Sequence, residues 1–375
     1  MKRYIYADNA ATTKLDAVAF EAMKPFLLDE YGNPSQLYSF SRIPKRAIRE
    51  ARETIASCIG ALPEEIFFTS GGTESDNWAI KGAASLNGQR RATITTAFEH
   101  HAILHSCKAI ERQGYPIVYL GPTNDGYITG EILKSYTKDK PFLVSVMYAN
   151  NEIGTVQPIK ELCTIAHKSG SLFHTDAVQA IGHVPINVHN LDVDMLSASA
   201  HKFNGPKGIG FLYIKKGIKI PSYIDGGAQE LKRRAGTENV AGIVGMAVAL
   251  KQNCDHLQEN NRYIEALEFE LISRLDAAGV DYIRNGGENR LPGFVSLSFI
   301  DMDGEAILHR MDLSGICVST GSACNSVSTE ISHVLKAIRL TDEYAKGTVR
   351  ISLGKENSQD DVETISQAIR KIVCT

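Results

Sequence analysis

Apolar residues recur every three to four positions in two stretches near the N-terminus. Residues 15–27 and residues 47–59 each place one apolar stripe along a helical period, and the second stripe ends at Gly60. Because this spacing gathers the side chains on one helix face, both stretches predict amphipathic helices. Pro25 argues against the second half of the first helix, since proline disrupts the turn that precedes it.

Short β-type runs then alternate with helical patterns from residue 66 to residue 214. The predicted strands are 66–69, 92–96, 116–120, 142–148, 172–174, 195–198 and 209–214, with helices after residue 74, at 101–112 and at 159–167. Apolar runs that are separated by helices are typical of a mostly parallel sheet with helices on both faces. This part of the chain therefore predicts an α/β fold.

The pattern changes in the last third of the chain. A single long helical stretch is expected over residues 240–278. After it come predicted strands at 294–299 and 348–353, helices at 305–310 and 332–338, and a C-terminal helix that residues 358–361 open with a loose capping box. Such a mixture predicts a smaller α+β domain.

Composition narrows the class of protein. The chain has 375 residues, 43% of them hydrophobic and 22% charged, which is globular composition, and the length suggests about two to three domains. A net charge of −3 argues against nucleic-acid binding, and the short basic cluster at 232–234 is expected to be solvated surface. No apolar run approaches the roughly 20 residues of a membrane span. Asp8 follows the basic N-terminus before an apolar stretch begins, so a secretory signal is not expected.

One of the seven cysteines stands in an unusual context. The cysteines are scattered, odd in number and without a C-x-x-C pair, which fits reduced thiols in a cytoplasm. Cys324 lies in a run of small residues, 319–326, which has no apolar stripe and is expected to be mobile and exposed, as suits a reactive thiol. The other positions predict core or structural roles for Cys58, Cys163 and Cys317 and an exposed position for Cys374.

Three segments that follow predicted strands carry complementary chemistry. Residues 70–73, Ser-Gly-Gly-Thr, form either a simple tight turn or a phosphate cradle at a helix N-terminus. Asp176 follows one strand, and Lys202 follows another between small residues and a Gly/Pro turn. Pyridoxal phosphate (PLP) needs a lysine for its Schiff base, an acid for its ring nitrogen and a phosphate site. The three signals together therefore indicate a PLP enzyme.

Further motifs carry a resemblance to a known family. They lie, in chain order, at residues 6–13, 31–35, 68–77, 99–100, 150–154, 174–179, 200–202, 234–239, 321–324 and 350–354. On these segments the chain resembles the cysteine desulfurases of the NifS/IscS-like group, within the class V PLP-dependent aminotransferases. The resemblance implies PLP-dependent transferase fold type I, with a seven-stranded-type sheet. It also implies a large PLP domain over 13–256, and a small domain of 1–12 and 257–375 that carries a mobile cysteine loop at about 319–331.

The resemblance assigns roles to the cofactor-binding residues. Lys202 would form the Schiff base and shuttle protons, Asp176 would pair with the ring nitrogen, Gln179 would bond the ring hydroxyl, and His100 would stack on the ring and help to move protons. The phosphate would be held by Gly72, Thr73, Ser199 and His201, and by Thr237 from the neighbouring subunit of a homodimer with shared sites. Asn151 is placed beside both cofactor and substrate. No metal is expected.

The same resemblance implies a reaction and its partners. Asn151 and Arg350 would bind the carboxylate of L-cysteine, with help from Asn33, and Cys324 would take the sulfur as a persulfide while L-alanine forms. The persulfide would pass to a protein acceptor for iron–sulfur assembly, tRNA or cofactor thiolation, or DNA sulfur modification. Alternatives are a class V aminotransferase, which needs no mobile thiol, a selenocysteine lyase, and a non-enzymatic sulfur carrier, which needs no Lys202.

A few positions depart from the family pattern or carry weaker signals. Gln36 and Tyr38 stand where the family usually has Ser and His, and Ile331 stands where it has Pro. These departures leave turnover rate and acceptor preference open. His101 and His105 have a spacing that could hold a metal ion on a helix, but a surface or half-buried pair is the favoured interpretation. His333 has no assigned role.

Overall fold

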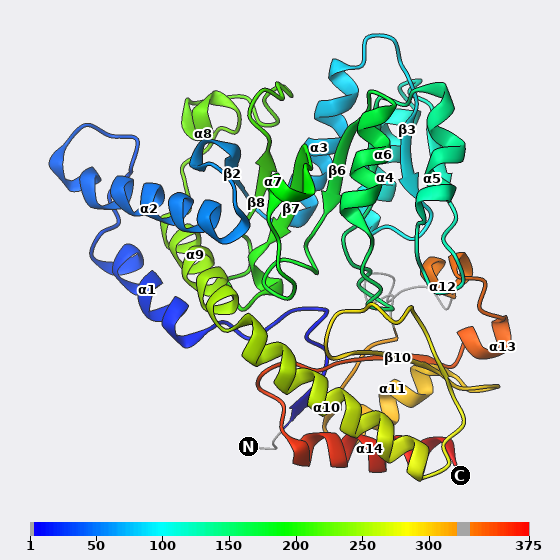
Figure 1. Cartoon of the computed structure of the whole chain (residues 1–375). Coiled ribbons are helices and arrows are strands. Elements are labelled where there is room, and N and C mark those ends of the chain that lie inside the picture. The colour runs from blue at the N-terminus through cyan, green and yellow to red at the C-terminus, as the bar shows by residue number, and fades with distance from the viewer. Residues whose placement is uncertain (1–3, 321–330, 375) are drawn as a thin grey trace.

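The computed structural model describes residues 4–320 and 331–374, and within them a seven-stranded sheet forms the centre of the larger part (Figure 1). The strand order is β2-β8-β7-β6-β5-β3-β4, and the strands run parallel except β8, which is antiparallel to β2 and β7. The strands are β2 (Ile66–Thr69), β3 (Thr93–Thr96), β4 (Ile117–Leu120), β5 (Leu143–Ser145), β6 (Leu172–Asp176), β7 (Met195–Ser199) and β8 (Gly210–Ile214). The predicted mostly parallel sheet is confirmed.

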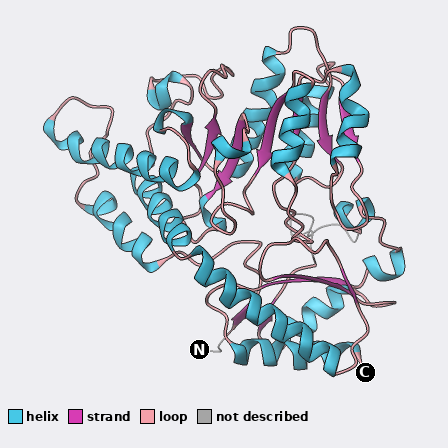
Figure 2. Cartoon of the chain, viewed as in Figure 1, coloured by secondary structure: helices cyan, strands magenta, loops and turns pink. Residues whose placement is uncertain are grey.

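Helices cover both faces of this sheet (Figure 2). They are α1 (Ala17–Leu28), α2 (Arg42–Ile59), α3 (Gly72–Leu86), α4 (His101–Glu111), α5 (Gly130–Tyr136), α6 (Ile159–Lys168), α7 (Val188–Leu191), α8 (Gln229–Lys232) and α9 (Val240–Asp255). Neighbouring strand residues alternate between two cores, because side chains of a strand point to opposite faces. Phe67 packs with Trp78 of α3, whereas Phe68 packs in the core that contains Ile55 of α2 and Leu162 of α6.

The C-terminal residues build a second sheet and core. Its strands are β9 (Ile283–Arg284), β10 (Phe294–Ser298) and β12 (Thr348–Ser352), and β1 (Ile5–Tyr6) pairs separately with β11 (Ile316–Cys317). The helices are α10 (Leu257–Ala277), α11 (Gly304–Leu313), α12 (His333–Ala337), α13 (Asp342–Ala345) and α14 (Gln359–Val373). Ala7 shares a core with residues from this region. The division at 13 and 256 stays a prediction, which this shared core supports.

Three predicted elements differ in their extent. The stretch 240–278 is two helices, α9 and α10, which meet at His256, so that α9 packs on α1 and α2 while α10 packs on α14. α1 continues through Pro25, because Asp16 caps its start and α9 packs along it. The strand predicted at 142–148 is only β5, although the backbone N–H of Val146 still donates to His174. None of the described helices combines the length and hydrophobicity needed to cross a bilayer.

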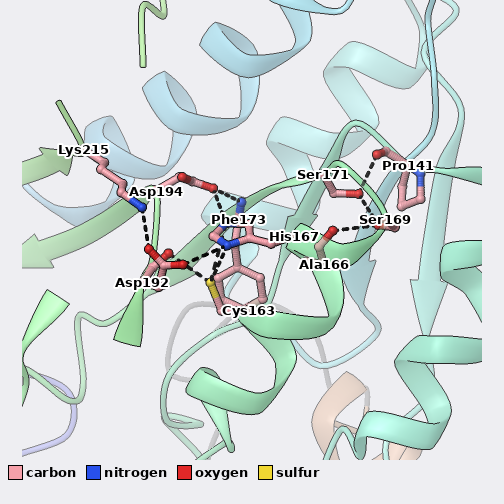
Figure 3. A network of polar contacts seen from close by, with 10 residues as sticks. All are labelled: Pro141, Cys163, Ala166, His167, Ser169, Ser171, Phe173, Asp192, Asp194 and Lys215. Atoms are coloured by element: carbon pink, nitrogen blue, oxygen red, sulfur yellow. Dashed lines mark hydrogen bonds and ion pairs between the residues drawn. The ribbon is translucent and has the colours of Figure 1, made fainter. Parts of the chain in front are cut away.

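A partly exposed polar network joins α6 to the loop between α7 and β7 (Figure 3). His167 lies between two carboxylates, with its Nε2 2.9 Å from Asp194 Oδ2 and its Nδ1 3.2 Å from Asp192 Oδ2. The Cys163 thiol donates to the Asp192 carbonyl over 3.1 Å and is fully buried, which confirms its predicted core position. Hydrogen bonding to Asp194, and then to Cys163, raises the pKa of His167 to about 10.

Because of the contacts of His167, we expect the folded protein to lose stability as the pH becomes alkaline. The pKa of His167 is higher in the folded state than its ordinary 6.5, so its stabilisation is complete below pH 6.5 and is lost as the pH rises towards 10. Urea unfolding of the wild type and of His167→Gln should therefore differ most at pH 6 and progressively less up to pH 10. The exposed His256→Gln serves as the control. A difference that stays constant with pH would contradict the expected charged state of His167.

Candidate functional site

A pocket with several polar and charged side chains lies where the sheet's strand ends meet the N-terminal segment and the second sheet. Its lining within the described residues includes ten of the predicted site residues. They are Gly72, Thr73, His100, Asn151, Asp176, Gln179, Ser199, His201, Lys202 and Arg350. Residues from five loops and from both sheets thus converge on one cavity. Cys324 lies outside the described residues.

The turn from β2 into α3 forms one end of the pocket. Gly71 has φ of 150°, and a Cβ at Gly72 would lie 2.6 Å from Cγ2 of Val178, closer than van der Waals contact allows. Glycine therefore lets the start of α3 approach the loop after β6. Thr73 lies in the first helical turn, where backbone N–H groups and the helix dipole favour an anion. This end of the pocket suits a phosphate.

Lys202 enters the pocket immediately after β7. A single 3-10 turn, Ala200–Lys202, follows the buried strand and directs the amine towards the N-terminal segment. Lys202 Nζ donates to the carbonyls of Ala10 and Ala11 over 2.5 and 2.9 Å. The lysine amine thus reaches the cavity, where it could form a Schiff base with a cofactor aldehyde.

Asp176 is the last residue of β6, the strand that pairs with β7. Its carboxylate accepts the N–H of Val178 over 2.9 Å, and its side chain is buried. Burial raises the pKa of Asp176 to about 6, while the charge of Lys202 acts in the opposite direction. Gln179, three residues on, donates from Nε2 to Ala10 O over 2.8 Å. The buried acid is suited to pair with a cationic ring nitrogen.

Two histidines line the pocket as neutral rings. His100 caps α4, and its Nδ1 accepts the N–H of Ala102 over 3.1 Å, so the ring proton is on Nε2. Burial, followed by the charge of Lys202, lowers the pKa of His100 to about 4. The same two causes lower the pKa of His201 to about 4. Neutral rings can stack on a flat heterocycle or donate a hydrogen bond to a phosphate.

Arg350 is the only arginine among the described residues that line the pocket, and its guanidinium is buried. It lies on β12 with a side chain that is 3% exposed. Nη2 donates to Asp8 Oδ1 over 2.6 Å, and Nη1 donates to the Asn151 carbonyl over 2.7 Å. Nε is buried and has no hydrogen-bond partner among the described residues. A guanidinium with an unused donor suits a carboxylate ligand.

Sequence reasoning missed three acids in or beside this pocket. Asp8 pairs with Arg350, and Asp76 and Glu99 are buried close to Asp176. Burial, followed by a contribution from Asp176, raises the pKa of Asp76 well above its ordinary value. Burial also raises that of Glu99 to about 8. A signal existed for Asp76, because it lies one helical turn after Gly72 and so shares its helix face.

Some predicted residues are not brought together. Thr237 is exposed, and neither it nor Asn33 is among the described residues that line the pocket. His101 and His105 lie with ring centroids 5.3 Å apart, and His333 is 4.8 Å from His101. In the described ranges, the group of three side chains close enough to share a metal ion is Asp76, His100 and Asp176, without His101 or His105.

The donor set fits PLP. A buried acid, an amine, a neutral ring and a helix N-terminus would meet its ring nitrogen, aldehyde, ring face and phosphate respectively. Lys202, Asp176, His100 and Thr73 supply these four groups from four different segments. The guanidinium of Arg350, which also lines the pocket, would suit the carboxylate of an amino acid substrate.

Comparisons with known proteins agree with this chemistry. The family model described as aminotransferase class-V matches residues 5–365. The cysteine desulfurase IscS of Clostridium botulinum is 46% identical over 377 aligned positions, which cover 100% of this chain and 95% of that protein. A structure titled NIFS-LIKE PROTEIN has a TM-score of 0.93 and 38% identity, and the match covers 99% of this chain and 100% of that one. A structure titled SspA in complex with cysteine has a TM-score of 0.84 and 36% identity, with 94% and 100% covered.

Proposed function

Because the chain belongs to the class-V aminotransferase family, we propose that it is a PLP-dependent cysteine desulfurase, which converts L-cysteine to L-alanine and keeps the sulfur as a persulfide on Cys324. The observation that carries this proposal is the convergence of Lys202, Asp176 and Arg350 on one pocket. The desulfurase name of the relatives and the cysteine complex of a similar structure support it further. The family and fold predicted from the sequence are confirmed.

Each polar side chain of the pocket has a task in this reaction. PLP supplies an electron sink next to the amino acid's Cα when it is bound. Arg350 binds the substrate carboxylate and so orients the Cα–H bond towards Lys202. The Lys202 amine takes the proton from Cα and returns a proton to the substrate. Asp176, as the anion, would stabilise a positive charge on the ring nitrogen of bound PLP, and the neutral His100 would be available to stack on the ring.

Cys324 completes the proposed reaction by nucleophilic attack. Its thiolate forms an S–S bond with the substrate sulfur while the substrate's C–S bond breaks. The electron pair of that bond stays with the substrate carbon, which takes a proton and becomes the methyl group of alanine. The transferred sulfur then leaves with a protein acceptor. The role of Cys324 rests on its sequence context alone.

Three rival functions use the same fold in other ways. A sulfur carrier would need the cysteine but not an amine, an acid and a phosphate cradle in one pocket, so the observed convergence favours an enzyme. An aminotransferase would need no thiol at residue 324. A selenocysteine lyase shares the pocket chemistry, and rates on both substrates with and without Cys324 would separate it from a desulfurase.

Mass spectrometry after brief exposure of the holoenzyme to L-cysteine tests the proposal. A desulfurase should show one added sulfur atom on the peptide that contains Cys324, together with a stoichiometric amount of alanine. Alanine without the adduct would indicate a lyase in which Cys324 is dispensable. If PLP-loaded protein gave neither product, the desulfurase function would be wrong, and amino-group transfer would be the next activity to assay.

We also propose that the chain forms a homodimer. Large apolar side chains of α1 and the loop after it are exposed, among them Leu28 at 70% and Leu37 at 96%. Several large apolar side chains exposed in one stretch of the chain are consistent with a protein interface. Thr237 is exposed as well, as a residue that reached a neighbouring subunit would be. Light scattering on the purified protein measures the mass, while the cytoplasmic location and the acceptor stay predictions.

A further inference from the structure

The guanidinium of Arg350 is held from two directions before any substrate binds. Asp8 Oδ1 accepts from Nη2 over 2.6 Å, and the Asn151 carbonyl accepts from Nη1 over 2.7 Å. A guanidinium has five N–H donors in a rigid plane. These two contacts use two of them, which leaves Nε–H and one hydrogen on each terminal nitrogen. Three donors are enough for a bidentate carboxylate.

Asp8 is itself firmly placed by the second sheet. It forms a parallel bridge with Ser352, two residues after Arg350 on β12, and the N–H of Ser352 donates to the Ala7 carbonyl over 2.8 Å. Its side chain is 17% exposed, compared with 3% for Arg350. Because the backbone of Asp8 is held in place by β12, the position of its carboxylate determines the plane of the Arg350 guanidinium.

The same short segment also contacts the lysine. The carbonyls of Ala10 and Ala11 accept from Lys202 Nζ, and Ala10 O accepts from Gln179 as well. Residues 8–11 therefore hold, at one end, the group that would bind the substrate carboxylate and, at the other, the amine that would act on Cα. The spacing between these two groups is set by the backbone of this segment.

We propose that Asp8 is a positioning residue for the substrate: its carboxylate orients Arg350 so that the unpartnered donors face the pocket and receive the amino acid's carboxylate. This inference rests on the proposed function, because it assigns a partner to the residue that would bind the substrate. Asp8 acts through a hydrogen bond and not through its charge. An anion beside Arg350 repels a second carboxylate, so the orientation must outweigh that repulsion.

Substitutions at Asp8 separate orientation from charge. Asp8→Asn keeps an oxygen acceptor for Nη2 and removes the charge, whereas Asp8→Ala removes both. The loss of a hydrogen bond to a charged group should weaken L-alanine binding by about tenfold in Asp8→Ala. Asp8→Asn should bind L-alanine at least as tightly as the wild type. The probe is L-alanine added to PLP-loaded enzyme, and binding is followed by the change in the cofactor's visible absorption.

Steady-state kinetics supply the second readout. Asp8→Ala should raise KM for L-cysteine by about tenfold and leave kcat within about twofold, because Asp8 touches none of the reacting atoms. Glu356→Ala is the matched control, since Glu356 pairs with Lys14 at 3.8 Å in an exposed contact between the same two parts of the chain. It should change neither constant. PLP content and circular dichroism establish that each variant is folded.

Each outcome decides a separate question. If Asp8→Ala binds L-alanine as tightly as the wild type, or more tightly, Asp8 is a competitor for Arg350 and the inference is overturned. If Asp8→Asn is as weak as Asp8→Ala, the charge matters and not the orientation, which also overturns it. Arg350→Ala should abolish L-alanine binding, and if it does not, the assigned carboxylate site is wrong. A wild type that forms no alanine from cysteine overturns the proposed function itself.

Discussion

Alanine formation from cysteine is expected to fall by about 10²–10⁴-fold in Lys202→Ala, the range typical of removing a positioned general acid–base group. Lys202 is the amine that the structure places at the end of β7, in contact with Ala10 and Ala11. No other described lysine combines that position with the pocket's phosphate cradle and buried acid, although Lys207 also lines the cavity. The measurement is alanine released under multiple-turnover conditions by PLP-loaded variant and wild type.

Two further measurements show that the loss belongs to Lys202 itself. Borohydride reduction of the wild type should fix PLP on the peptide that contains Lys202, and the variant should lose that adduct. Exposed Lys232→Ala controls for the removal of a lysine elsewhere and should keep full activity. Full turnover by Lys202→Ala, or an adduct on another lysine, would show that Lys202 is not the cofactor's lysine.

PLP affinity is expected to fall by about 10²–10⁴-fold in Asp176→Ala, since removing one partner of a buried ion pair costs about 3–5 kcal/mol. The pKa of Asp176 is raised to about 6. Its carboxylate is therefore an anion above that pH and neutral below it. PLP affinity of the wild-type apoprotein should accordingly decrease as the pH falls through about 6, and equilibrium dialysis or fluorescence titration measures it.

The isosteric variant isolates the charge. Asp176→Asn keeps the shape and cannot ionise, so its PLP affinity should be low and should not change around pH 6. Asp125→Asn, at an exposed loop position, should behave like the wild type. If the wild-type affinity is flat between pH 5 and pH 8, or if Asp176→Asn binds PLP normally, Asp176 is not the counter-charge of the ring nitrogen.

The sequence was informative wherever a strand ended in a polar residue. Asp176 and Lys202 could be placed at one cavity because adjacent parallel strands end at the same edge of a sheet, and β6 and β7 are indeed neighbours. The patterns in residues 42–214 predicted the seven strands and α2, α3, α4 and α6, since burial of alternate faces is what produces those patterns, but they did not predict the short helices α5 and α7. The resemblance to a family was needed to assign a role to most other site residues.

What could not be predicted depends on contacts between distant parts of the chain. The junction of α9 and α10 at His256 has no proline or glycine, and it follows from the two helices packing on different cores. Asp8 carries no motif of its own that points to Arg350, which is 342 residues away. Glu99 is a charged residue type that ordinarily lies at the surface, so sequence patterns do not predict its burial.

The segment of residues 8–11 also determines when the protein can become active during synthesis. The N-terminal residues leave the ribosome first, but β1 pairs with β11 and Asp8 bridges Ser352, which are made near the end of translation. Domains generally fold as they emerge, so the central sheet can assemble while residues 5–8 still lack their partners on β11 and β12. The arginine of the pocket would not yet exist at that stage, and Asp8 would lack its partner. A chain that stops before residue 350 would therefore retain a folded scaffold without a working pocket.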